Sequence, residues 1–394
     1  MPKLIVNTNR SIRGDTLVVL LLEGGMDGLY VVPPHNEAAL RHQRLDLALP
    51  ETGRPGGAID LDGVFGLHPL LASWSDLFRA GHLAVVHACG SPDQTLSHFE
   101  ASLTLQTGGH DSSAQADGWL TRHLASAGEF PDGENASKSL RAVAFGTSLP
   151  PLLRGSTSSV VLSSLSELRL NIPSAWSPDW AQTLSQLYAI GKSLPSVSGR
   201  NTIRMLDDLK ALQRNEIRDP QFSAYDPSPL GRQLKELCTL IRANVGLEVA
   251  VVRQGGWDAH QGQDALLQPL LKTLSRSIRA FYEDLGDCTE RVTIVVLTEF
   301  GRRVRVNLAK GTDHGRGTAM FVIGGGIQGG KVYGEWPGLE PEQLDEGGNL
   351  RVTTDFRDVL AEVALKRLAN PAIEKLFPGY TPKTMNICTH TGTA

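Results

Sequence analysis

Residues 291–317 read RVTIVVLTEFGRRVRVNLAKGTDHGRG, and this stretch decides how the rest of the chain is interpreted. Its apolar run 292–297 is rich in β-branched residues and has no polar alternation, which predicts a strand buried on both faces of a sheet. Polar residues follow directly: Glu299, Arg302, Arg303, Asp313 and His314. Ligands of open α/β sheets bind beyond the carboxyl ends of the strands, and carboxylate and imidazole groups bind divalent metals. We therefore interpret this stretch as the floor of a metal-dependent active site.

The bulk composition indicates a globular α/β protein and excludes several other classes. The 394 residues are 41% hydrophobic and 20% charged, which provides a sizeable core. A net charge of -4 and the lack of a long basic run argue against nucleic acid as a partner. The four cysteines are far apart without CxxC spacing, which favours reduced thiols. The chain starts without a signal-peptide core or paired arginines and has no membrane-spanning apolar run, so we expect a cytoplasmic protein with no membrane partner.

A first strand is predicted over residues 15–22, DTLVVLLL, and the Gly-rich turn EGGMDG follows at 23–28. Glycines allow a sharp bend and a close approach of the backbone to a ligand. Asp27 stands at the carboxyl end of this strand, where it is a candidate metal ligand. The alternative is a turn aspartate, favoured for its local hydrogen bonds.

A second strand is predicted over 83–88, LAVVHA, and SPDQTLSHFE follows at 91–100. Ser97 and Glu100 have the spacing of a capping box before a helix that ends near residue 106. Ser97 is also a candidate nucleophile, because a hydroxyl at a helix N-terminus lies near free N–H groups that favour an anionic ligand. The two roles are compatible. His87, inside the strand, is interpreted as a hydrogen-bonded core histidine.

A third strand, over 246–252, leads into GGWDAH at 255–260. Asp258 and His260 are two residues apart in an extended segment, so their side chains project to the same side and both can bind one metal ion. The alternative is an ordinary pair of surface polar groups. The segment 265–285 has leucines at helical spacing and predicts a core helix.

Residues 128–230 are rich in Ser, Pro and Gly and contain two helical stretches, near 179–190 and 201–215. We interpret this segment as an insert or cap-like subregion within a single domain that spans residues 1–394.

The candidate residues converge because a doubly wound sheet gathers the carboxyl ends of its strands at one edge. Mixed carboxylate and imidazole ligands suit zinc, manganese or iron, and one or two divalent ions fit the number of candidates. Arg302 or Arg303 is expected to clamp an oxyanion of the substrate, the alternative being a solvated charge. His98, next to Ser97, is a further candidate for substrate binding.

Ten motifs occur in order along nearly the whole chain. Together they resemble the bacterial "domain of unknown function 1501" family, a sulfatase-like branch of the alkaline phosphatase superfamily. The motifs are EGGMDG (23–28), FGLHP (65–69), SHF (97–99), DGWL (117–120), GGWDAH (255–260), LTEFGRR (297–303), GTDHGRG (311–317), GGKVYGEWPGL (329–339), TTDFRDVL (353–360) and LFPG (376–379).

The resemblance implies an alkaline-phosphatase-like α/β fold, with a central, mostly parallel sheet and helices on both faces. It also implies residue roles, carried over by motif: Asp27 as the first-strand metal aspartate, Ser97 as the metal-bound nucleophile, Asp258, His260 and His314 as ligands of one metal, and Glu299 as a ligand of a second. Phe300 departs from the superfamily, which has a histidine at that position. One metal is therefore as compatible with the sequence as two, with Asp313 or water completing the second site.

The function that the resemblance implies is metal-dependent hydrolysis of a small-molecule phosphate or sulfate ester. The segment around Ser97 lacks the Pro and Arg of the C/S-x-P-x-R context in which sulfatases of the superfamily mature their nucleophile, so a phosphoester is favoured. The main alternative is a catalytically inactive, metal-bound binding or scaffold protein, supported by Phe300. A phosphomutase is a third option. The sequence leaves the oligomeric state open.

Overall fold

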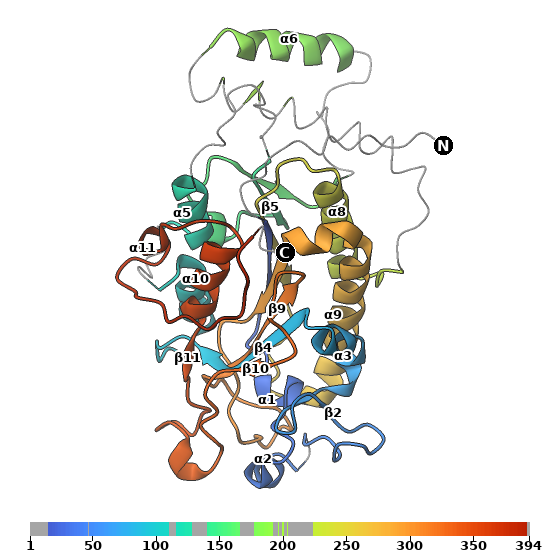
Figure 1. Ribbon diagram of the computed structural model, residues 1–394, viewed down its shortest axis with the longest axis vertical. Helices are drawn as coiled ribbons and strands as arrows, with labels where there is room; N and C mark the ends of the chain where they lie inside the picture. The colour runs from blue at the N-terminus through green and yellow to red at the C-terminus, as the bar shows by residue number, and fades with distance from the viewer. Residues whose placement is uncertain are drawn as a thin grey trace.

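The computed structural model describes residues 15–45, 47–109, 116–127, 140–165, 177–191, 196, 199–200, 203 and 224–391. Within this part of the chain one large sheet forms the centre of the molecule (Figure 1). Its strands follow the order β10-β4-β9-β8-β1-β7-β5-β6, and β11 pairs with β4. The strands are β1 (Thr16–Leu22), β4 (Leu83–Gly90), β5 (Ala142–Phe145), β6 (Ser159–Leu162), β7 (Val249–Gln254), β8 (Val292–Leu297), β9 (Thr318–Gly324), β10 (Val332–Tyr333) and β11 (Thr354–Asp355).

The predicted mostly parallel sheet is confirmed. Strand β1 runs parallel to both β7 and β8, and β5 runs parallel to β6 and β7. Strand β9 is antiparallel to β8 and to β4, so β4 runs in the same direction as β8. The carboxyl ends of β1, β4, β7 and β8 therefore lie at one edge of the sheet, together with the start of β9.

Both faces of the sheet are buried, which explains why its strands are continuously apolar. In β1, Val18, Leu20 and Leu22 belong to one core, whereas Leu17 and Val19 belong to the opposite one. The first core includes residues of α3 (Ala72–Arg79), α8 (Pro229–Arg242) and α9 (Gln263–Leu285). The second includes residues of α4 (His98–Thr107), α5 (Trp119–Ser126), α10 (Phe356–Lys366) and α11 (Ile373–Leu376). Figure 1 shows α3, α8 and α9 on one side of the sheet and α5, α10 and α11 on the other.

Shorter elements complete the described fold. The helices α1 (Gly28–Val31) and α2 (Ala38–Gln43) follow β1, and a separate two-stranded sheet joins β2 (Ile59–Asp60) to β3 (Gly66–Leu67). Short 3-10 helices lie at η1 (Pro69–Leu71), η2 (Pro151–Leu153), η5 (Gly286–Arg291) and η6 (Pro341–Gln343).

The predicted insert falls largely on residues outside the described ranges. The helix expected near 179–190 is present as α6 (Ser177–Ala189), which Figure 1 places at the top of the view, apart from the layers that cover the sheet. The helix expected near 201–215 lies almost wholly outside the described residues. The insert and the single domain remain predictions.

No helix in the described part of the chain has both the length and the apolar character that a membrane crossing requires.

Candidate metal centre

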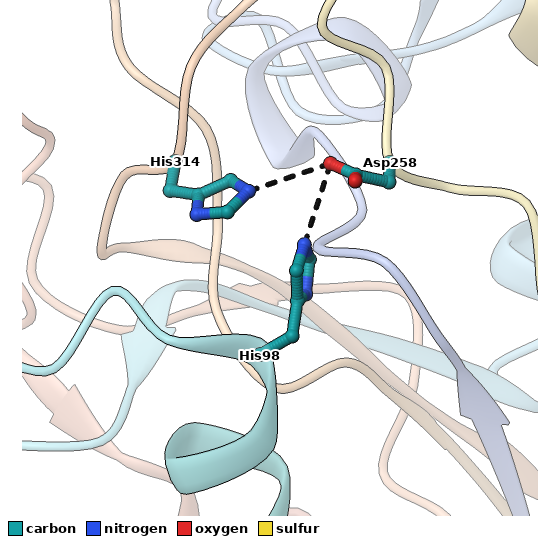
Figure 2. Close-up of side chains that lie close together, drawn as sticks. All are labelled: His98, Asp258 and His314. Carbon is teal, nitrogen blue, oxygen red and sulfur yellow. Dashed lines mark hydrogen bonds and ion pairs between the residues drawn. The ribbon is translucent and has the colours of Figure 1, made fainter.

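The start of one helix and two loops at the carboxyl edge of the sheet bring His98, Asp258 and His314 together (Figure 2). His98 is the first residue of α4, which follows β4, Asp258 lies in the loop after β7, and His314 lies in the loop before β9. Their nearest ligand atoms all lie within 4.8 Å of one another. Asp258 Oδ1 is 3.3 Å from His98 Nε2 and 3.4 Å from His314 Nε2.

His260 adds a fourth side chain to this group. Its Nε2 lies 3.1 Å from Asp258 Oδ1 and 2.8 Å from His314 Nε2. The extended segment after β7 therefore directs Asp258 and His260 to the same side, as their spacing predicts. Three imidazole Nε2 atoms and one carboxylate oxygen converge, and we call this group the histidine cluster.

Each Nδ1 atom of the histidine cluster lies next to an oxygen that can accept a hydrogen bond, and these oxygens favour the tautomer with the hydrogen on Nδ1. His98 Nδ1 lies 2.6 Å from Glu299 Oε1, His314 Nδ1 lies 2.7 Å from the carbonyl oxygen of Leu96, and His260 Nδ1 lies 3.2 Å from Asp313 Oδ1. Carbonyl and carboxylate oxygens only accept hydrogen bonds, so each ring carries its hydrogen on Nδ1. The neutral form of each ring then presents an unprotonated Nε2 to the cluster.

This arrangement favours a cation. The facing Nε2 lone pairs of His260 and His314 repel each other unless positive charge lies between them. Protons can supply that charge, and a divalent metal would supply it while also binding His98, Asp258 and His314 together. In the described residues, His98 Nε2 is buried without a hydrogen-bond partner. Donors bound tetrahedrally at about 2.0–2.2 Å lie about 3.3–3.6 Å from one another, and the Nε2 atoms of His98 and His314 lie 3.3 and 3.4 Å from Asp258 Oδ1. The residues fit a metal such as zinc, manganese or iron.

Glu299 and Phe300, which follow β8, contact the imidazole rings and fix their positions. Glu299 is buried and accepts hydrogen bonds from His98 Nδ1, the amide of Gly24 (2.9 Å) and Thr298 Oγ1 (3.0 Å). The ring of Phe300, 4% exposed, has its centroid 4.7 Å from that of His98 and 4.8 Å from that of His314. Both residues thus hold ligand rings in place, and Glu299 holds a tautomer as outer carboxylates do in metal sites.

Arg302 fixes the position of Asp258 through a hydrogen bond. The guanidinium is buried and donates to the carbonyl oxygens of Gly25 (2.8 Å) and Thr312 (2.9 Å), to that of Gly24, and to Asp258 Oδ1 at 2.6 Å. Burial acts to raise the pKa of Asp258, but the hydrogen bond and charge of Arg302, with His260 and His98, outweigh it and lower the pKa to about 2. Asp258 is therefore ionised at any physiological pH.

Close packing of backbones makes this geometry possible. Gly24, with φ of +120°, lies so near the loop after β7 that a Cβ there would come 2.4 Å from the amide nitrogen of Asp258. Only glycine fits this position, and the turn after β1 consequently fixes the place of Asp258.

The family of the chain follows from its sequence over the region that contains the cluster. The model of the family described as "protein of unknown function (DUF1501)" matches residues 83–368, which is more than half of the chain. The chain belongs to the DUF1501 family. The predicted recognition is confirmed, and the matched region includes all four cluster residues. No curated protein matches the sequence.

Several solved structures resemble this DUF1501 protein at low identity. The lipoteichoic acid synthase LtaP from Listeria monocytogenes is 10% identical, with a TM-score of 0.36, and the match covers 96% of this chain and 75% of that one. A putative sulfatase from Bacteroides thetaiotaomicron is 11% identical, with a TM-score of 0.35 and coverage of 94% and 76%. The 2-O GAG sulfatase BT1596 is 11% identical, with a TM-score of 0.32 and coverage of 94% and 72%.

Asp27 lies in a separate buried group in the DUF1501 protein. Its Oδ1 accepts from the amides of Leu29 and Tyr30 and caps α1, while its Oδ2 is 2.6 Å from Arg44 NH1 and 2.7 Å from Gln263 Nε2. Among the described residues, the structure does not bring Asp27 into the histidine cluster. Both oxygens of its carboxylate already have protein partners.

Ser97 is the N-cap residue of α4, as predicted, but the predicted capping box is wrong. The Ser97 side chain makes no cap hydrogen bond, and Glu100 instead accepts from Thr95 Oγ1 at 2.6 Å. Thr95 Oγ1 also accepts from the Ser97 amide, so a threonine two residues earlier replaces the serine in the turn. The exposed Ser97 hydroxyl is left out of the cap, between Leu96, whose carbonyl contacts His314, and His98.

Two other predicted residues lie at the periphery. Arg303 is exposed, and its carbonyl oxygen accepts from Arg44. Asp313 contacts the outer nitrogen of His260 and accepts from Asn307 Nδ2 at 3.1 Å. The Asn307 hydrogen bond, with those from His260, lowers the pKa of Asp313 against the opposing effect of burial.

His98 was predicted to bind substrate and not metal. Like Asp258, it follows the end of a buried strand, and this position could have indicated a metal ligand. The pairing of Nδ1 with Glu299 became visible only in the fold.

Proposed function

We propose that this protein is a metal-dependent hydrolase of small-molecule phosphate or sulfate esters, with Ser97 as the nucleophile and phosphoesters favoured. The observation that carries the proposal is the convergence of the Nε2 atoms of three histidines on Asp258 Oδ1. One of these histidines, His98, directly follows Ser97, whose hydroxyl makes no cap hydrogen bond. The resemblance of the motifs to a sulfatase-like branch of the alkaline phosphatase superfamily points to the same chemistry.

The histidine cluster would hold a single divalent ion through His98, Asp258, His260 and His314. Such an ion supplies Lewis-acid stabilisation of charge on ester and hydroxyl oxygens. A second ion has little support, because Phe300 offers no ligand atom and Glu299 is engaged with His98. Asp313, the residue expected to complete the second site, contacts the outer nitrogen of His260, and the carboxylate of Asp27 is paired with the buried guanidinium of Arg44.

Ser97 is placed for covalent catalysis by its position at the N-terminus of α4. Its oxygen would attack the phosphorus or sulfur, the ester bond to the alcohol would break, and water would then release the phosphate or sulfate from the serine. Ser97 is exposed and its side chain makes no cap hydrogen bond. Neither burial nor a competing contact with the helix backbone would therefore hinder this attack.

Arg302 and Arg303 would have different roles. Arg302 is buried and donates to backbone carbonyls and Asp258, so it acts as a positioning residue for that ligand. Arg303 is exposed and remains available to bind an anionic substrate group.

A metal-bound protein without catalytic activity is the second candidate. Phe300 favours it, because an apolar ring packs against two cluster imidazoles where a hydrolase with two ions would need a ligand. In that case the ion would organise the start of α4 and the two loops for binding a partner.

The test combines metal analysis of the purified protein with p-nitrophenyl phosphate, bis-p-nitrophenyl phosphate and p-nitrophenyl sulfate. We expect one ion per chain, and turnover that is lost in Ser97→Ala and in Asp258→Ala. Ser97→Ala should keep the metal, whereas Asp258→Ala should lose it. Ser228→Ala is a matched control, because Ser228 is also an N-cap residue but caps α8. Stoichiometric metal without turnover of any ester would favour the second candidate.

A further inference from the structure

A series of buried hydrogen bonds runs from Asp27 to the loop that carries His314, and its central member is Gln263, the first residue of α9. The side chains of Gln263 and Thr312 are both fully buried. Gln263 Nε2 donates to Asp27 Oδ2 at 2.7 Å, and Thr312 Oγ1 donates to Gln263 Oε1 at 2.5 Å. Because a carboxylate only accepts hydrogen bonds, these two partners fix the orientation of the Gln263 amide.

Thr312 joins the two loops that carry three residues of the histidine cluster. Its amide donates to the carbonyl oxygen of Ala259 at 3.0 Å, and Ala259 lies between Asp258 and His260 in the chain. His314 follows two residues after Thr312 on the other loop. A shift of Thr312 would therefore change the distance between His314 and the loop after β7.

The two loops are also in direct backbone contact beside Thr312. A Cβ at Gly311 would come 2.2 Å from the carbonyl carbon of His260, a distance that no side chain can occupy. The amide of Gln263 donates to the carbonyl oxygen of Lys310 at 2.9 Å, so the start of α9 holds the same segment through its backbone as well. The loop that leads to His314 is thus fixed against both α9 and the loop after β7.

The beginning of this loop is held by the same buried group. Arg44, which donates to Asp27 Oδ2 at 2.6 Å, also donates to the carbonyl oxygens of Arg303 (2.6 Å) and Val304 (2.7 Å). Asp27 is therefore linked to the beginning of the loop through Arg44 and to its end through Gln263. A shift of the Gln263 side chain would release only the end that leads to the cluster.

We propose that Gln263 is a positioning residue of the metal centre, which holds Thr312 so that His314 binds the same ion as the loop after β7. This inference rests on the metal site of the proposed function and is independent of which ester is hydrolysed. Both ends of the Gln263 amide bind protein groups, so Gln263 acts through Thr312 and is not itself a ligand.

The test removes the two ends of the Gln263–Thr312 hydrogen bond separately. Gln263→Leu removes the amide, and Thr312→Val removes the hydroxyl while the shape of the side chain is kept. Each should weaken metal binding about 10-fold, the low end of the range for residues that orient ligands. Thr312→Ser keeps the hydroxyl and should bind the metal as the wild type does. Adding Thr312→Val to Gln263→Leu should cause no further loss, because the hydroxyl has then already lost its partner.

Metal affinity is measured by competitive chelator titration, and the visible absorption of the cobalt-loaded protein reports the coordination geometry. The spectrum should change in Gln263→Leu and Thr312→Val but not in Thr312→Ser. Gln106→Leu is the matched control, because Gln106 is also a buried glutamine but donates to Ser102 on its own helix, α4. It should leave the affinity and the spectrum unchanged.

Urea unfolding of the metal-free variants separates positioning from folding. Lower stability with an unchanged metal affinity and cobalt spectrum would overturn the inference, as would an equal loss of affinity in Thr312→Val and Thr312→Ser. The two Thr312 variants decide the question if Gln263→Leu does not fold.

Ester turnover is measured separately on each protein. Metal binding that depends on Gln263 and Thr312, without turnover of any ester, would contradict the proposed hydrolase while supporting the positioning role. Turnover with a metal affinity that is independent of both residues would support the hydrolase and overturn the inference.

Discussion

Glu299 accepts a hydrogen bond from His98, with 2.6 Å between Oε1 and Nδ1, and this bond leaves Nε2 of His98 free to face Asp258. The same oxygen accepts from the amide of Gly24. One carboxylate thus links the end of β8 to the start of α4 and the turn after β1. The cluster depends on this link, because an imidazole that rotated or changed tautomer would withdraw its ligand atom.

Glu299→Gln should weaken metal binding about 10- to 100-fold, because the amide holds the His98 tautomer less firmly than a carboxylate does. The measurement is a competitive chelator titration of the metal-loaded protein. Glu100→Gln is the control, since Glu100 is an exposed residue of α4 that contacts Thr95. Equal metal affinity in Glu299→Gln and the wild type would refute the role assigned to the hydrogen bond.

Phe300→Ala should lower the free energy of unfolding of the metal-free protein by about 3–5 kcal/mol, because it removes a buried ring and leaves a cavity beside two imidazoles. Urea unfolding measures the change. Phe99→Ala, with Phe99 72% exposed, is expected to stay within about 0.5 kcal/mol of the wild type. Similar losses for the two variants would mean that Phe300 does not pack as described.

Arg44→Met should destabilise the protein by about 3–5 kcal/mol, because it leaves the buried carboxylate of Asp27 without its cation. Adding Asp27→Asn should recover much of this loss, so a double-mutant cycle should show favourable coupling. Arg41→Met removes an exposed partner of Glu51 and should cost less than about 1 kcal/mol. Additive effects of the Arg44 and Asp27 substitutions would argue against the ion pair.

Acid should destabilise the protein through His123. Burial lowers the pKa of this histidine to about 3, and the charge of Arg141 acts in the same direction. Because the folded pKa lies below the unfolded value of about 6.5, the unfolded chain binds the proton first. The stability is complete above pH 6.5 and falls as the pH drops toward 3, by up to about 1.4 kcal/mol per unit.

The measurement is urea unfolding at pH 7.5, 6 and 5. His123→Gln does not titrate, and its amide oxygen can replace Nδ1 as the acceptor for Asn370 Nδ2, which lies 2.9 Å from it in the wild type. The variant should therefore lose stability less steeply on acidification than the wild type. Parallel pH profiles would exclude His123 as a source of the acid sensitivity.

Local patterns were sufficient to predict several elements of the fold. The apolar run 292–297 coincides with β8, and the leucine spacing of 265–285 corresponds to α9 (Gln263–Leu285). Strands buried on both faces appear as continuous apolar runs and amphipathic helices show a period of 3.6 residues, and both patterns are written in consecutive residues. Asp258 and His260 were predictable together for the same reason, because they are two residues apart.

The partner of each side chain was not predictable in this way. Ser97 and Glu100 have capping-box spacing, yet Thr95 takes the contact with Glu100. Asp27 has the place of a metal ligand after the first strand, yet Arg44 reaches it from a segment beyond α1. In both cases several groups compete for one partner, and the backbone path of a loop decides which of them is nearest.

The sequence by itself determined a largely parallel, doubly buried sheet and the set of acidic and imidazole residues that follow its strands. Only the tertiary structure decided that His98 joins Asp258, His260 and His314, and that Glu299, Arg302 and Phe300 hold them. The physical reason is range: periodicity acts between near neighbours in the chain, whereas the His98–Glu299 hydrogen bond joins residues 201 positions apart and exists only once the strands have paired.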